Sequence, residues 1–136
     1  MSKYNDYRPL TKSLDELLKL MKGHKLILIG DVPGASKFNV MDCITKLRWF
    51  NSDNCLVMQK ENLSTAPSNV NKILKEYASK HKNVYFVNPF TTFCKSGFCK
   101  NLDSNGTPFY SDGNHLSKTG SEYFIKRIKS KIINII

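Results

Sequence analysis

No stretch of this 136-residue sequence provides the roughly 20 consecutive apolar residues that a helix needs to cross a bilayer. The N-terminus, MSKYNDY, is polar and aromatic, and no apolar segment typical of a signal peptide follows it. Internal repeats and low-complexity tracts are also missing. The sequence therefore predicts neither a membrane span nor an export signal of its own.

A metal-binding pattern is missing as well. The sequence has no Cys-x-x-Cys motif, and no His stands at zinc-like spacing from a pair of cysteines. We therefore expect no metal site, and no motif points to another cofactor.

The four cysteines form two close pairs along the chain, which suggests disulfides, although four cysteines allow three connectivities. The simplest pairing joins Cys43 to Cys55 and Cys94 to Cys99. Disulfides would place the domain in an oxidising compartment, which the missing signal does not explain. Either the cysteines stay reduced in the cytosol, or the chain is part of something longer, and we favour the second alternative.

Acidic residues are scarce, with 11 Asp and Glu against 21 Lys and Arg, so the formal net charge is +10. A basic surface favours anionic partners such as acidic glycans, lipid headgroups or nucleic acid, in a salt-dependent way. A nucleic-acid binder would more often concentrate arginine and aromatic residues on one element. The lysines here are scattered, so nucleic-acid binding is the least favoured alternative. A flat response to salt in binding to random DNA would eliminate it.

The apolar pattern predicts an α/β fold in a single domain. Residues 25–30 and 83–87 are continuous apolar runs of strand length, typical of strands covered on both faces of a parallel sheet. Residues 55–58 are a further short strand or a tethered loop. Because only two clear strands are present, the sheet would have an open edge, which is a liability for an isolated domain.

Helices are expected around these strands. Capping boxes at 13–16 and 119–122 predict two helix starts, and Asn39 and residue 66 predict two more. The Asn39 helix would run to about Phe50. Residues 1–10 read as an extended lead-in, and residues 90–107 as a long loop pinned by a disulfide. The order of elements is typical of a layered α/β fold.

One turn carries candidate chemistry. Residues 109–117, FYSDGNHLS, place Asp112 and His115 three positions apart. A carboxylate that accepts one ring N–H fixes the tautomer of an imidazole, and the other ring nitrogen can then take a proton from a hydroxyl. The alternative is an Asx-turn followed by a solvated histidine, and so short a motif does not decide between them.

The chain resembles the C-terminal part of an SGNH-fold domain, in the version fused to bacterial membrane O-acyltransferases of the acyltransferase-three group. Those proteins acetylate lipopolysaccharide, peptidoglycan and other surface glycans. The matching stretches, in order, are LILIGDVP (26–33), NVMDC (39–43), VYFVNP (84–89), FCKSGFC (93–99) and FYSDGNHLSKTG (109–120). The last is the most specific, because Asp-x-x-His-Leu-Ser and the following Gly keep the family spacing.

The resemblance implies a three-layer, flavodoxin-like parallel sheet flanked by helices, with residues 1–136 forming one partial domain that is incomplete at its N-terminus. It implies His115 as the catalytic base and Asp112 as the carboxylate that orients it. The family's nucleophile is the Ser of a Gly-Asp-Ser motif on an upstream strand. Here Gly30-Asp31-Val32 has Val at that place. Ser36 is the nearest hydroxyl, and we do not expect it to replace the nucleophile.

We therefore expect the C-terminal portion of an O-acyltransferase or esterase domain acting on cell-surface glycans. Its partners would be a glycan or acyl-donor substrate, the missing upstream SGNH segment and a membrane acyltransferase domain. The parent protein would hold it on the periplasmic face. Without the Ser no covalent acyl-enzyme can form, so whether the chain is an enzyme stays open. The alternatives are a catalytically inactive glycan-binding or structural remnant, and a basic nucleic-acid-binding module.

Overall fold

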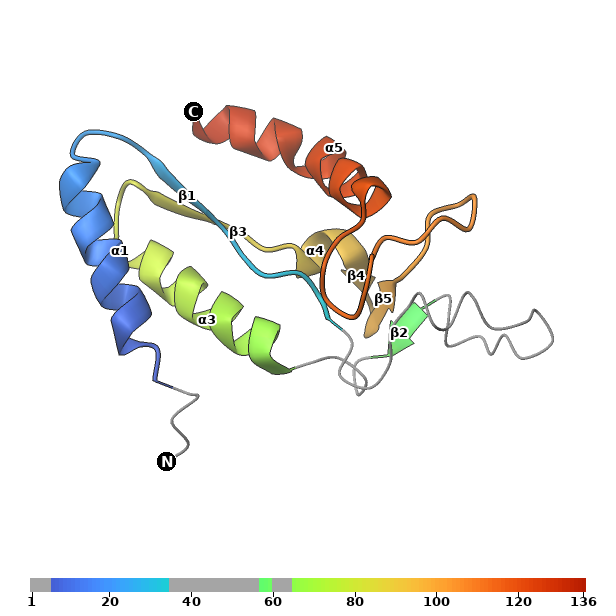
Figure 1. Cartoon of the computed structure of the whole chain (residues 1–136). Helices are drawn as coiled ribbons and strands as arrows, with labels where there is room; N and C mark the ends of the chain where they lie inside the picture. Colours follow the sequence, from blue (N-terminus) through green and yellow to red (C-terminus); the bar gives the residue numbers. More distant parts are fainter. Residues whose placement is uncertain (1–5, 35–56, 60–64) are drawn as a thin grey trace.

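The structure is a computed structural model that describes residues 6–34, 57–59 and 65–136. The elements in chain order are α1 (Arg8–Leu20), β1 (Leu26–Ile29), β2 (Val57–Gln59), α3 (Thr65–Ser79), β3 (Val84–Val87), α4 (Phe90–Phe93), β4 (Cys94–Lys95), β5 (Phe98–Lys100) and α5 (Lys118–Ile135) (Figure 1). The helix expected from Asn39 to Phe50 lies outside the described residues, as do Ser36, Cys43 and Cys55. In the described ranges, no helix has the length and apolar character to span a membrane.

The two apolar runs form a parallel strand pair, as their lack of alternation predicted. Leu26 of β1 lies opposite Val84 of β3, and the register continues to Ile29 opposite Val87. Figure 1 shows α1 and α3 on one side of this pair and α5 on the other. The expected three-layer α/β arrangement is therefore confirmed.

The two faces of the strand pair build two separate apolar clusters, because successive side chains of a strand point to opposite faces. On one face, strand residues meet α1 and α3; this cluster contains Leu14, Leu26, Leu28, Leu74, Tyr77, Val84 and Phe86. On the other face, strand residues meet α4, α5 and the segment before α5; this cluster contains Ile27, Val87, Phe93, Phe109, Tyr110, Phe124 and Ile128.

The sequence predicted that β1 is covered on both faces. This prediction is wrong at the C-terminal end of the strand. The Ile29 side chain is 48% exposed. Among the described residues, β1 pairs only with β3, so nothing covers the outer edge of the strand. The open edge that the sequence suggested is present in this part of the chain.

The helix α1 begins earlier than the sequence indicated. It starts at Arg8, with Pro9 in its first turn. Proline suits this position because the N–H that it lacks would have no partner inside the helix. Residues 8–10 therefore belong to the helix and not to a lead-in, and the expected capping box at 13–16 lies inside it.

The start of α5 also differs from the prediction. The helix begins at Lys118, and the capping residue is Ser117, whose Oγ accepts the Gly120 N–H at 3.1 Å. A serine in this role satisfies one of the unpaired N–H groups of the first turn. The predicted capping box at 119–122 was therefore wrong, because the cap stands before it.

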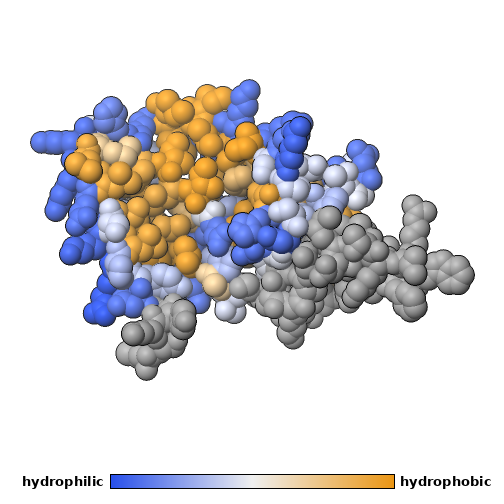
Figure 2. Space-filling view, viewed as in Figure 1, coloured by the Kyte–Doolittle hydropathy of each residue, from blue (hydrophilic) through white to orange (hydrophobic). Residues whose placement is uncertain are grey.

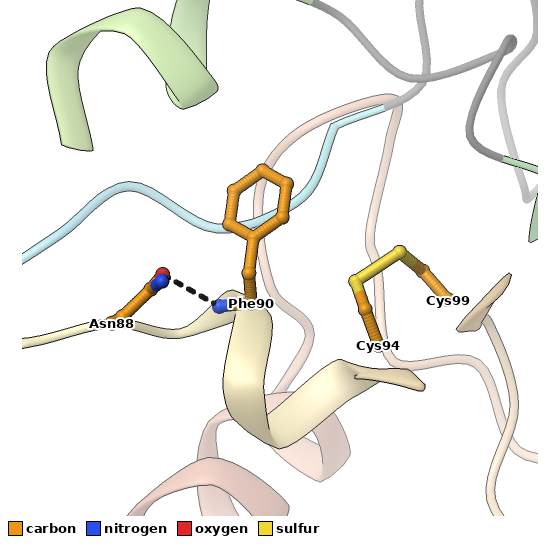
Figure 3. The surroundings of a disulfide bond; sticks show 4 residues. All are labelled: Asn88, Phe90, Cys94 and Cys99. Carbon is orange, nitrogen blue, oxygen red and sulfur yellow. Dashed lines mark hydrogen bonds between the residues drawn. A yellow bond between two sulfur atoms is a disulfide. The ribbon is translucent and has the colours of Figure 1, made fainter. Parts of the chain in front are cut away.

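The segment 90–107 is not one long loop. It holds the short helix α4 and the strands β4 and β5, which pair antiparallel around Ser96 and Gly97, both at positive φ. Cys94 and Cys99 lie opposite each other in this hairpin and form a disulfide (Figure 3). The expected Cys94–Cys99 bridge is thus present, whereas strands this short leave no periodic pattern in the sequence.

We expect the double substitution Cys94→Ala/Cys99→Ala to lower the free energy of unfolding by about 2 kcal/mol, because the bridge closes a short loop and limits the unfolded chain. Urea denaturation would measure the loss. Lys95→Ala, an exposed change in the same hairpin, serves as the control and should stay within about 0.5 kcal/mol of the unsubstituted chain. Equal stability of all three proteins would contradict the prediction.

Candidate active site

The loop that carries Asp112 and His115 is held at both ends by the backbone. An isolated β-bridge pairs Tyr110 with Leu116, and the Ser111 N–H donates to the His115 carbonyl at 2.8 Å. The Tyr110 side chain is fully buried in the cluster beside α5. This loop, residues 111–115, therefore projects from a fixed base.

The first turn of α5 lies directly against the segment that precedes this loop. The Ser117 N–H donates to the Phe109 carbonyl at 2.8 Å, and the Ser117 Oγ donates to the Pro108 carbonyl at 2.6 Å. A Cβ on Gly120 would overlap the Phe109 carbonyl oxygen. Glycine at this position allows the close approach that ties the loop to the helix.

Asp112 uses both carboxylate oxygens within the loop. Its Oδ1 accepts the N–H groups of Asn114 at 2.8 Å and of His115 at 2.7 Å, while its Oδ2 lies 2.6 Å from the Nδ1 of His115. Oδ1 forms the Asx-turn and Oδ2 contacts the imidazole, so both predicted arrangements are present. In the neutral form of the imidazole, an ionised carboxylate that accepts from Nδ1–H leaves Nε2 as the nitrogen with a free lone pair.

The imidazole is oriented but open. The His115 side chain is 73% exposed and that of Asp112 is 43% exposed. Within the described part of the chain, Nε2 forms no hydrogen bond. The structure thus brings the two predicted residues together and leaves the far nitrogen accessible to another group. Their catalytic roles stay predictions.

The pair lies beyond the carboxyl end of β1. A Cβ on Gly34, in the buried stretch after this strand, would stand 3.1 Å from the Asn114 Cβ and 3.4 Å from the Gly113 carbonyl oxygen. Active sites of open α/β sheets gather at this edge. The loop after β1 and the loop before α5 therefore meet where such a site is expected.

Sequence reasoning missed the role of Asn71 in this region. Asn71 is buried on α3, and its side-chain amide exchanges two hydrogen bonds with the backbone of Asp31: Oδ1 accepts the N–H at 2.7 Å, and Nδ2 donates to the carbonyl at 2.8 Å. A Cβ on Gly30 would come within 2.5 Å of that Oδ1. The sequence indicated this role only by placing a polar residue three positions before Leu74, within the apolar stripe of a helix.

Hydrogen bonding keeps Asp112 ionised. The Asn114 N–H, followed by the His115 ring and the His115 N–H, lowers the pKa of Asp112 from its ordinary 3.8 to about 2. Because folding lowers the pKa of this carboxyl group, its ionisation stabilises the folded state. The stabilisation is complete at pH values above 3.8, the pKa of the group in the unfolded chain. That contribution is lost as the pH falls toward 2.

We expect NMR titration of the Asp112 carboxyl carbon to give a midpoint near pH 2. In His115→Ala the midpoint should move part of the way back toward 3.8, because the ring bond is removed while both backbone donors remain. Ser121→Ala, which leaves this loop unchanged, is the control. An identical midpoint in His115→Ala would show that the ring does not contact the carboxylate in solution.

The described ranges offer a groove but no metal-binding cluster. Within them, no three His, Cys, Asp or Glu side chains form a group that could hold a metal ion. A groove of about 650 Å³ lies between the segment 100–104 and α5, and neither Asp112 nor His115 lines it. The Arg127 guanidinium stands 3.3 Å over the Tyr123 ring beside this groove. The oriented imidazole is therefore the better candidate for chemistry.

Comparison with known proteins shows the family of the chain. The family model described as "SGNH domain (fused to AT3 domains)" matches residues 2–130. The chain belongs to this SGNH family. The resemblance inferred from the sequence is thereby confirmed.

Two solved structures share the SGNH fold of the chain. The periplasmic domain of a lipopolysaccharide acetyltransferase from Salmonella ser. Paratyphi A matches 91% of the chain with a TM-score of 0.71 and 22% identity. A putative platelet activating factor from Streptococcus pneumonia matches 90% with a TM-score of 0.55 and 18% identity. This chain spans 48% of each of those two chains. A search of curated proteins gave no match.

Proposed function

We propose that the chain supplies the Asp112–His115 half of a Ser-His-Asp acyl-transfer site in an SGNH domain, and that the Ser comes from polypeptide outside residues 1–136. The observation that carries this proposal is the 2.6 Å contact between Nδ1 and the carboxylate, with Nε2 open beyond the carboxyl end of β1. The absence of a hydroxyl at Val32 supports an external Ser.

In the proposed reaction, Nε2 of His115 takes the proton of the Ser hydroxyl as the Ser oxygen attacks the acyl carbonyl. The imidazolium then gives this proton to the departing alkoxide or thiolate, and an acyl-enzyme ester is left. An acceptor hydroxyl loses its proton to Nε2 as it attacks the ester, and the Ser recovers its proton. Asp112 stabilises the imidazolium in each half and holds the ring in place.

The parent family supports a proposal for the substrate class. We propose a cell-surface glycan as acceptor and a membrane acyltransferase domain as partner, on the periplasmic face. The fusion of domains of this family to acyltransferase-three domains supports this, as does the similarity to the periplasmic Salmonella domain. The Cys94–Cys99 disulfide suits an oxidising compartment, and a net charge of +10 suits an acidic glycan.

Burst kinetics with p-nitrophenyl acetate test the proposal. Residues 1–136 alone should release no stoichiometric burst of p-nitrophenol, and the same chain assembled with the Ser-bearing segment of its parent domain should release one equivalent. A burst from the chain alone would contradict an external nucleophile. Glycan binding without a burst from either sample would instead favour an inactive binding remnant.

A further inference from the structure

Among residues 6–34, 57–59 and 65–136, the outer edge of β1 has backbone groups without strand partners. The N–H of Leu26 donates to the Asn83 carbonyl and that of Gly30 donates to the Val87 carbonyl, so residues 26, 28 and 30 face β3. In a parallel ladder the backbone N–H and C=O groups of the intervening residues point to the opposite edge of the strand. The N–H and C=O groups of Ile27 and Ile29 therefore face the free edge. The next N–H and C=O groups on this edge belong to Asp31, and both form hydrogen bonds with the Asn71 side chain.

An apolar surface flanks this free edge. Figure 2 shows apolar side chains gathered over β1 between α1 and α5. We call this surface the β1 face; the exposed large apolar residues of the three elements are Leu17 and Leu20 of α1, Ile29 of β1, and Ile125 and Ile133 of α5. Unpaired strand groups and large exposed apolar side chains together mark a surface that another polypeptide covers.

We propose that the β1 face docks the remaining half of an SGNH-type domain, which adds a parallel strand to β1 at Ile27 and Ile29. The identity of this occupant rests on the proposed function. The two solved structures support this occupant, because this chain matches 48% of each and leaves 52% of each without a counterpart. The new strand would extend the sheet whose carboxyl edge lies beside His115.

Two other occupants fit the surface less well. A second copy would bring together two chains of net charge +10, which repel each other. It would also pair β1 with itself antiparallel across a two-fold axis, whereas a strand without polar alternation is typical of a parallel sheet. A lipid surface supplies no hydrogen-bond partners for the backbone of Ile27 and Ile29.

The test uses the Ser-bearing segment of the parent domain, made as a separate protein and mixed with residues 1–136. Light scattering should show a one-to-one complex. The Ile27 and Ile29 amides should exchange with deuterium at least about 100-fold more slowly in it, since strand pairing protects both groups.

Matched charge substitutions localise the contact. Ile29→Lys should weaken the complex by about 30-fold or more, because it would bury a charge at the new contact. Phe98→Lys is the control: Phe98 is 49% exposed, like Ile29 at 48%, but it lies on β5. Ile29→Pro removes an edge donor without removing a bond to β3 and should weaken the complex independently of charge.

Each contrary result has a defined meaning. No complex, unprotected Ile27 and Ile29 amides in the complex, or equal binding by Ile29→Lys and Phe98→Lys would overturn the proposal. So would a dimer of the chain alone with both amides protected, or binding to anionic vesicles that Ile29→Lys abolishes. A normal complex that gives no acyl-enzyme burst would contradict the proposed function and leave the docking surface intact.

Discussion

Replacing His115 by alanine is expected to lower acyl transfer by the assembled parent domain at least about a thousandfold. A positioned general base contributes roughly 10²–10⁴ in rate, and this imidazole would act in both halves of the reaction. Mass spectrometry of acylated glycan and the p-nitrophenol burst measure the loss. Because the ring is 73% exposed, the melting temperature should stay nearly unchanged.

The Asp112→Asn substitution is expected to have a similarly large effect for a different reason. The amide would leave the ring in place but remove the charge that fixes its tautomer and stabilises the imidazolium, a loss of about 10⁴ in the serine-protease case. The chain offers a matched control in Asp103→Asn. Asp103 also accepts two backbone N–H groups, from Asn105 and Thr107, but no imidazole contacts it.

These variants separate catalysis from turn structure. If Asp112 served only as the Asx-turn residue, Asp112→Asn and Asp103→Asn would lower stability by similar small amounts and leave acyl transfer equal. If His115 were merely a solvated ring, His115→Ala would retain full activity. Either result would contradict the assignment of the pair to an acyl-transfer site.

The sequence predicted the features that depend on local pattern. The apolar runs of β1 and β3 lack alternation, which indicated a parallel pair between helices. The spacing of Asp112 and His115 is short enough that one turn determines their contact. The Cys94–Cys99 pairing is equally local, since the two residues face each other across a hairpin turn.

The features that the sequence did not predict depend on contacts between distant segments. The buried Asn71 meets Asp31 across 40 positions, so its role needs the packing of α3 against β1. The start of α5 was misplaced because Ser117 and Thr119 stand close together and both could cap the helix. Ser117 is the cap, and its Oγ also donates to the Pro108 carbonyl. Ile29 continues the apolar run of β1, and no local pattern distinguishes a covered strand end from an exposed one.

Gly120→Ala is expected to be the most destabilising addition of a single methyl group, at about 3 kcal/mol. Helix propensity alone predicts the opposite, since alanine in a helix is favoured over glycine by about 1 kcal/mol. The new Cβ, however, would overlap the Phe109 carbonyl oxygen, and that oxygen cannot withdraw without losing the Ser117 N–H. Steric overlap with fixed backbone should therefore outweigh propensity.

Urea denaturation of Gly120→Ala beside Ser121→Ala measures this balance. Ser121 is exposed in the same turn of α5, so its substitution should change stability by less than about 0.5 kcal/mol. In the assembled parent domain, Gly120→Ala should also lower acyl transfer, because a displaced Phe109 moves the base of the loop that holds His115. A Gly120→Ala chain more stable than the unsubstituted one would mean that α5 does not press on Phe109. The position of the imidazole would then depend on the loop alone, and the close packing of this helix would have no part in the site.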